Sequence, residues 1–104
     1  METISNIDNI RKAISEGNVC LKFGAEWCGP CRVLETNIDT IAPEFPNINF
    51  IGVDVDDVDD ESILYEYSIR NVPVLFFIKN GEIVKKEVGA MSKDYLSETL
   101  KEVF

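Results

Sequence analysis

The chain has 104 residues, of which 45% are hydrophobic and 28% are charged, and its net charge is −9 at neutral pH. This length favours a single globular domain spanning residues 1–104. A chain this acidic is a poor ligand for nucleic acid or for anionic membranes, because both attract basic surfaces. The chain contains no histidine, which excludes hydrolases that depend on a Ser–His or Cys–His pair.

The sequence also bears on where the protein works. The start, METISNIDNIRKA, lacks the basic and apolar regions of a secretory signal, and no apolar stretch is long enough to cross a membrane. Three cysteines are too few for a disulfide scaffold, and their odd number argues against full pairing. We therefore expect a reducing compartment, the cytoplasm.

Strand and helix periodicities alternate along the chain. A short strand near Thr3–Ile4 is expected to precede a helix capped by Ser5 or Asn6. The Asn80–Gly81 pair between two apolar runs predicts a tight hairpin. The other expected elements are a strand at 19–24, a helix from the cysteine pair to about 42, a strand at 48–55, a helix at 61–68, strands at 73–79 and 82–88, and a last helix capped by Ser92.

This order of elements predicts an α/β domain. Strands separated by helices need crossover connections, which favour parallel pairs, while the hairpin adds an antiparallel edge. We expect three layers, α/β/α, around a central mixed sheet of four to five strands.

Two cysteines, Cys28 and Cys31, lie where a buried strand gives way to a helix. Free N–H groups and the positive end of the helix dipole at this point stabilise a thiolate. Helix N-termini and Cys-x-x-Cys motifs lower a thiol pKa, and the thiolate is the nucleophile. We therefore predict that Cys28 attacks and that Cys31, one turn later and more buried, resolves the mixed disulfide.

Other interpretations of the cysteine pair are weaker. A structural disulfide across so short a loop constrains little of the unfolded chain. A zinc or iron–sulfur site needs two more ligands, whereas only Cys20 remains and it falls within a strand, so no metal site is expected. Two inert buried thiols do not fit a position beside Trp27. The acidic run Asp54–Glu61 lacks the ligand spacing of a calcium loop, and we interpret it as a solvated turn that caps the following helix.

The segment WCGPC at a strand–helix junction resembles the active site of the thioredoxin family, and FGAEWCGPCR, VDVDD, YSIRNVPVLFFIKNGE and VGAMSK extend the similarity from about residue 19 to 92. The resemblance implies the thioredoxin fold and a redox disulfide between Cys28 and Cys31. Pro73 matches the family's cis-proline, which lies against the active site. Matches to the family's apolar docking surface are Trp27, Gly29, Pro30, Val72 and Gly89; Val72 is equally well explained as a core residue, and Gly89 as the end of a strand.

The chain departs from the family pattern at four positions. Lys22 occupies the place of a buried aspartate beneath the cysteines, and Gly52 stands where a charged residue faces that aspartate. Thr36 replaces a proline that kinks the active-site helix, and Val74 replaces a threonine. Lys22 either extends its ammonium to water or acts on Cys31, as a charge that favours the thiolate or, if neutral, as a base.

The resemblance implies a small protein disulfide reductase that acts by dithiol–disulfide exchange. Its expected partners are a thioredoxin reductase, which uses NADPH through a flavin or uses ferredoxin, and protein disulfide substrates. We expect a monomer with no bound cofactor, no nucleic acid and no membrane partner. Cys20 is expected to be a small buried hydrophobe. The alternative function is a thioredoxin-fold binding module or an accessory subunit of a larger complex.

Overall fold

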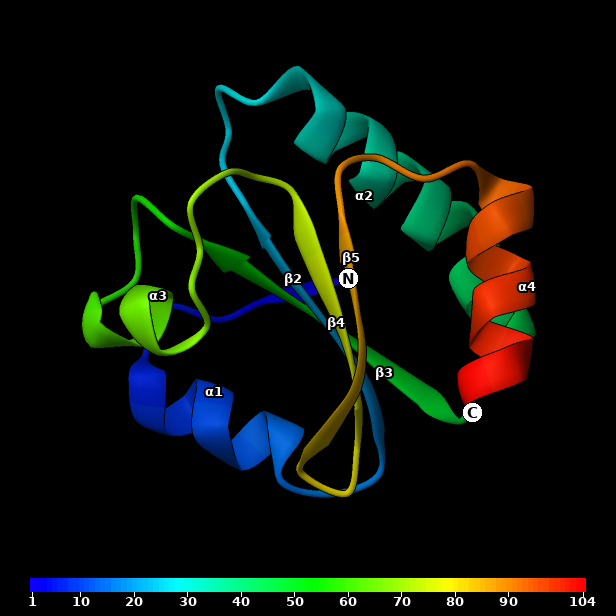
Figure 1. The fold of residues 1–104 in the computed structure, drawn as a ribbon, viewed down its shortest axis with the longest axis horizontal. Helices are drawn as coiled ribbons and strands as arrows, with labels where there is room; N and C mark the ends of the chain where they lie inside the picture. Colours follow the sequence, from blue (N-terminus) through cyan, green and yellow to red (C-terminus); the bar gives the residue numbers. More distant parts are fainter.

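A computed structural model describes residues 1–104 and contains one five-stranded sheet in the order β1-β3-β2-β4-β5 (Figure 1). The three-layer α/β/α architecture and the mixed sheet predicted from the sequence are confirmed. The strands are β1 (Glu2–Thr3), β2 (Asn18–Gly24), β3 (Ile48–Asp54), β4 (Val74–Lys79) and β5 (Glu82–Val88).

The direction of β4 differs from the prediction. The pairs β1–β3 and β2–β3 are parallel, as crossover connections require, but β4 runs antiparallel to β2 as well as to β5. The expectation that every helix would mark a parallel crossover was therefore wrong for the connection between β3 and β4.

The length of α3 (Ser62–Glu66) explains this reversal. Its five residues advance only about 7.5 Å along a helix axis, whereas a strand of the length of β4 spans about 20 Å. A helix this short cannot carry the chain back along the sheet. The chain stays at the end of the sheet where β3 finished, and β4 starts there and runs in the opposite direction.

Helices cover both faces of the sheet (Figure 1). Helices α1 (Ile7–Ile14) and α3 pack on one face, while α2 (Gly29–Ile41) and α4 (Lys93–Val103) pack on the other. A single 3₁₀ turn, Ala42–Glu44, follows α2. No helix of this fold is long and apolar enough to pass through a membrane.

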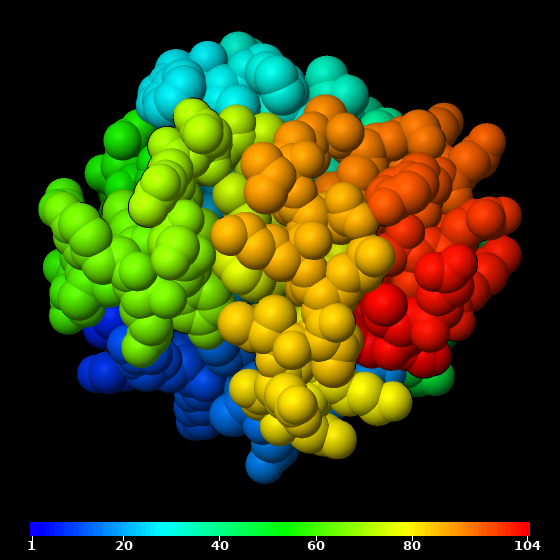
Figure 2. Space-filling model, viewed as in Figure 1, coloured from blue at the N-terminus to red at the C-terminus, as the bar shows by residue number.

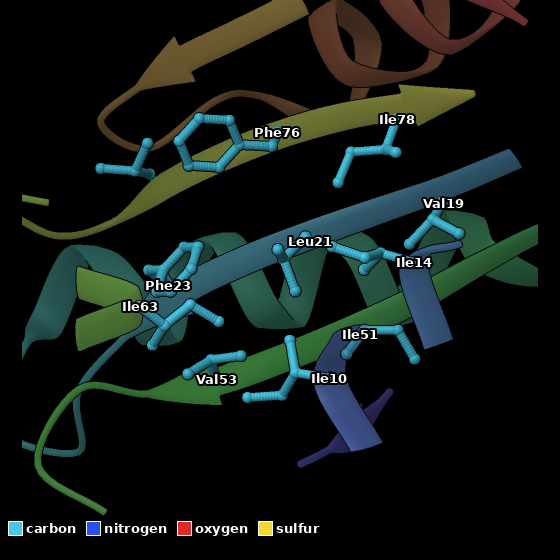
Figure 3. Close-up of a cluster of buried hydrophobic side chains, with 11 residues drawn as sticks. Ile10, Ile14, Val19, Leu21, Phe23, Ile51, Val53, Ile63, Phe76 and Ile78 are labelled. Atoms are coloured by element: carbon cyan, nitrogen blue, oxygen red, sulfur yellow. The ribbon is translucent and has the colours of Figure 1, made fainter. Parts of the chain in front are cut away.

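Alternation along β2 divides its side chains between two cores. Val19, Leu21 and Phe23 belong to the cluster under α1 and α3, together with Ile10, Ile14 and Ile63 (Figure 3). Cys20 points to the opposite face and joins the cluster under α2 and α4. Because strand side chains alternate, Lys22 points to that same face. The strand therefore directs a lysine toward α2.

Side-chain caps and a tight turn set the ends of several elements. Asn6 and Ser92 cap α1 and α4 through their side-chain oxygens, which accept from the N–H groups of Asn9 and Tyr95. Asn80 and Gly81 both have positive φ, 50° and 83°, which suits the predicted hairpin turn. The hairpin places β5 at the surface, where Figure 2 shows it in yellow and orange between α3 and α4.

Candidate functional site

Cys28 and Cys31 form a disulfide, with Cα atoms 5.2 Å apart, at the beginning of α2. Cys28 is the N-cap residue, and its sulfur accepts a hydrogen bond of 3.2 Å from the N–H of Cys31. Cys28 is 5% exposed and Cys31 is 1% exposed. The sequence-predicted position at a strand–helix junction is confirmed, and a thiolate on Cys28 would meet both an N–H donor and the positive end of α2.

The segment before β4 lies against Cys28. The Val72–Pro73 peptide bond is cis, and the Val72 carbonyl oxygen is 3.7 Å from the Cys28 sulfur. The carbonyl of Pro73 accepts a hydrogen bond of 2.9 Å from the N–H of Gly89. The antiparallel return of β4 thus places residues 72 and 73 beside a cysteine more than forty positions earlier in the chain.

Around the disulfide, the surface combines exposed apolar groups with open space. Trp27 is 69% exposed, and both Gly29 and Gly89 have no other side chain or backbone within 4 Å of the point where a Cβ would lie. Pro30 is exposed in the first turn of α2, and Val72 is half-buried. These residues leave room for another chain to approach Cys28.

Sequence reasoning missed Asp56, which is part of this surface. Its carboxylate accepts a hydrogen bond of 2.7 Å from the indole N–H of Trp27. Asp56 lies in the turn after β3, within the acidic run that was interpreted as a solvated turn with a helix cap. That interpretation holds for Asp60, which lies just before the N-cap Glu61 and accepts from the N–H of Ser62. Hydrogen bonding to the side chain and the backbone of Ser62 lowers the pKa of the Asp60 carboxyl. The segment VDVDD, which is similar to the family, contains Asp56, but no role was predicted for this residue, because its contact depends on how two loops approach each other.

Lys22 is only 6% exposed and lines a cleft of about 490 Å³ beneath the disulfide. A Cβ placed on Gly24 would lie 3.2 Å from Cε of Lys22 and 3.4 Å from Sγ of Cys31, so Gly24 marks a narrow gap between these two side chains. The Lys22 ammonium lies 3.6 Å from the carboxylate of Glu35. Glu35 is the second residue that sequence reasoning missed, although its position one turn after Cys31 was a usable signal.

The other departures from the family pattern also have clear positions. Gly52 is the register partner of Lys22 on β3, so the residue directly opposite Lys22 carries no charge, while Asp54 at the end of β3 lines the same cleft. Thr36 lies inside the continuous helix α2, and Val74 is buried at the start of β4. Cys20 is fully buried, as expected, and desolvation raises the pKa of its thiol.

Comparison with known proteins places this site in a family. A thioredoxin family model matches residues 3–102. A thioredoxin of Chlamydia trachomatis is 33% identical over 96 residues, covering 92% of each chain. A thioredoxin of Mycoplasmoides gallisepticum is 33% identical over 102 residues, covering 97% of this chain and all of that protein.

Solved structures agree with these sequence relatives. The X-ray structure of Fasciola hepatica thioredoxin superimposes with a TM-score of 0.86 at 32% identity, covering 98% of both chains. Plasmodium falciparum thioredoxin gives a TM-score of 0.89 at 26% identity over the full length of both chains. With its cysteine pair joined at the start of α2, this protein is a thiol–disulfide oxidoreductase that reduces protein disulfides by dithiol–disulfide exchange, and it belongs to the thioredoxin family.

Proposed function

We propose that Cys28 is the nucleophile and Cys31 the resolving thiol of a two-electron carrier that reduces disulfides in other proteins. The observation that carries this assignment is the hydrogen bond from the Cys31 N–H to the Cys28 sulfur at the N-cap of α2. That bond and the helix dipole favour the thiolate of Cys28 over that of Cys31.

The exchange takes place in two balanced steps. The Cys28 thiolate attacks one sulfur of a substrate disulfide, the substrate S–S bond breaks, and the released thiolate takes up a proton. Cys31 then loses its proton and attacks the Cys28 sulfur, which forms the Cys28–Cys31 disulfide and expels the second substrate thiolate. The substrate gains two electrons, and the chain becomes the disulfide form.

Substrate chains dock on the surface around Cys28, formed by Trp27, Gly29, Pro30, Val72, Pro73 and Gly89. The exposure of Trp27 and the open space at both glycines support this role. The Val72 carbonyl, close to the reacting sulfur, is placed to accept a hydrogen bond from an incoming backbone N–H. Lys22 modulates Cys31 from the opposite side, and its burial beside that cysteine supports this role.

A thioredoxin reductase returns the disulfide to the dithiol, and the protein acts as a monomer in the cytoplasm. The odd number of cysteines and the buried, unpaired Cys20 fit a reducing compartment. Light scattering of the purified chain, and reduction of its disulfide by NADPH- or ferredoxin-dependent reductases, test the oligomeric state and the partner.

An insulin-reduction assay with dithiothreitol tests the assignment of the cysteines. Cys28→Ser should lose the catalysed reaction, whereas reduced Cys31→Ser, mixed with insulin without dithiothreitol, should accumulate a mixed disulfide with the substrate on Cys28. Undiminished activity of Cys28→Ser would rule out the proposed nucleophile. A stable complex with one partner that survives Cys28→Ser would instead identify a binding module or accessory subunit.

A further inference from the structure

The cleft beneath Cys31 contains a charge arrangement that the exchange reaction does not explain. The Lys22 side chain is only 8% exposed, and its ammonium has one carboxylate within ion-pair distance, that of Glu35, at 3.6 Å. A buried charge is costly unless another charge or hydrogen bonds compensate it. Gly52, opposite Lys22 on β3, offers no charged group, and Asp54 at the end of β3 makes no ion pair with Lys22, so the compensating carboxylate is that of Glu35 on α2.

Helix α2 fixes the spatial relation of Glu35 to Cys31. The two residues are four positions apart, which places them on one face of the helix about 5–6 Å apart at Cβ. Both line the same cleft as Lys22. The other charged residues that line this cleft are Glu26 in the loop before α2, Arg32 on α2 and Asp54 at the end of β3.

We propose that Glu35 is the counter-charge of Lys22 and that the two form a balanced ion pair which keeps the Cys28–Cys31 couple a reductant. The Lys22 ammonium alone would favour a thiolate on Cys31 and hence the dithiol form, which makes the disulfide a stronger oxidant. The Glu35 carboxylate alone would do the reverse. Glu35 touches no reacting atom; it acts as a positioning and charge-balancing residue.

This inference rests on the proposed role of Cys31 as the resolving thiol, and its test separates the two. Cys31 is titrated in a Cys28→Ser chain by the far-ultraviolet absorbance of the thiolate, which needs no catalysis. Cys20 does not interfere, because burial raises the pKa of its thiol. Loss of catalysis in Cys28→Ser therefore tests the proposed function. The pH midpoint of the Cys31 thiol titration in the same chain tests the ion pair.

Charge balance predicts opposite signs for the two single substitutions. At a fixed pH near the midpoint, Glu35→Gln should raise the thiolate-to-thiol ratio of Cys31 by about three- to tenfold, and Lys22→Met should lower it by a similar factor. The double variant should return toward the parent ratio. Glu35→Asp should keep the parent ratio, and Glu44→Gln, the same charge change at an exposed site away from the cleft, should leave it unchanged.

A second measurement uses the intact cysteine pair. Equilibrium with glutathione should shift toward the dithiol in Glu35→Gln and toward the disulfide in Lys22→Met, most strongly at alkaline pH, where the Cys31 thiolate is populated. A merely structural role of Glu35 would alter thermal unfolding without producing opposite shifts. Shifts of the same sign, no shift in Glu35→Gln, or a double variant that keeps the full Lys22→Met effect would overturn the proposal.

Discussion

The indole N–H of Trp27 donates a hydrogen bond of 2.7 Å to the carboxylate of Asp56. This bond joins the loop before α2 to the turn after β3, two segments that flank the disulfide. Trp27 is largely exposed, so packing against the core does little to fix its orientation. Asp56 supplies that constraint, and the docking surface begins with an aromatic ring that is held in place before a substrate arrives.

Asp56→Ala should release the indole. The acceptor of this hydrogen bond is charged, and the bond lies at an exposed site. Its loss should therefore remove about 1 kcal/mol of the free energy that holds the indole ring in place, which corresponds to an approximately fivefold decrease in the rate of insulin reduction. Trp27 is the only tryptophan, so the fluorescence of the protein reports directly on the mobility of this indole. Quenching of that fluorescence by acrylamide should increase in Asp56→Ala. Asp57→Ala, next in sequence, is the control and should resemble the parent. Unchanged quenching in Asp56→Ala would contradict this interpretation.

Leu34 and Val33 are neighbours on α2 with opposite environments. Leu34 is fully buried, and Val33 is 54% exposed. Leu34→Ala should lower the free energy of unfolding by about 2–5 kcal/mol, because it leaves a cavity between α2 and the sheet. Val33→Ala should change it by less than about 0.5 kcal/mol. Urea denaturation of the disulfide form measures both, and similar losses in the two variants would contradict the assigned packing.

The buried Cys20 thiol should make stability depend on alkaline pH. Burial raises the pKa of Cys20 in the folded chain, whereas the thiol of the unfolded chain ionises at about pH 8.5. Above that pH the unfolded chain binds fewer protons, so the free energy of unfolding should fall with pH, by at most about 1.4 kcal/mol per unit from this group. The stabilisation that the neutral Cys20 thiol contributes to the folded chain is fully present below about pH 8.5 and decreases above it.

Urea denaturation between about pH 7.5 and 10 measures how the free energy of unfolding falls with pH. The experiment uses the double variant Cys28→Ser/Cys31→Ser, because the unfolded Cys20 thiolate could otherwise exchange with the disulfide. Cys20→Ala in the same background is the comparison. Tyr67, whose pKa is also raised by burial, titrates in both chains, so its contribution cancels in the difference. Equal slopes would show that Cys20 does not titrate as its burial requires.

Gly81 should tolerate a side chain poorly, unlike Gly29. Gly81 has φ of +83° and a Cβ there would lie 3.4 Å from the carbonyl oxygen of Ser15, whereas Gly29 has no positive φ and open surroundings. Gly81→Ala should therefore lower the free energy of unfolding by about 1–2 kcal/mol. Gly29→Ala should be close to neutral in stability. Thermal unfolding compares them, and a neutral Gly81→Ala would argue against the left-handed turn.

Local sequence patterns predicted much of this fold. The hairpin followed from Asn80–Gly81, and the position of the cysteines followed from a buried strand that meets a helix start. Local patterns did not predict the direction of β4, because that direction depends on the length of α3. The sequence suggested a helix of eight residues at 61–68, and the structure retains five as α-helix.

The residues of the candidate site also differ in whether local sequence patterns could predict them. Cys28, Cys31 and Lys22 could be found from sequence because a motif and a strand pattern identify them. Glu35 could have been found, since it lies four positions after Cys31 on the same helix and β2 directs Lys22 toward α2. Asp56 could not, because its contact with Trp27 arises between two irregular segments whose approach is set by the rest of the fold.

The antiparallel return of β4 has a consequence for how the protein gains activity. We expect residues 72 and 73 to reach the cysteines only once β4 has paired with β2, a contact between segments far apart along the chain. Contacts of such long sequence separation form late, because closing a long loop costs entropy before any pairing is gained. A nascent chain that has emerged only as far as β3 would carry both cysteines but would lack Val72, Pro73 and Gly89, half of the docking surface. Recovery of insulin reduction during refolding should therefore follow closure of the sheet, so that redox activity itself measures completion of the fold.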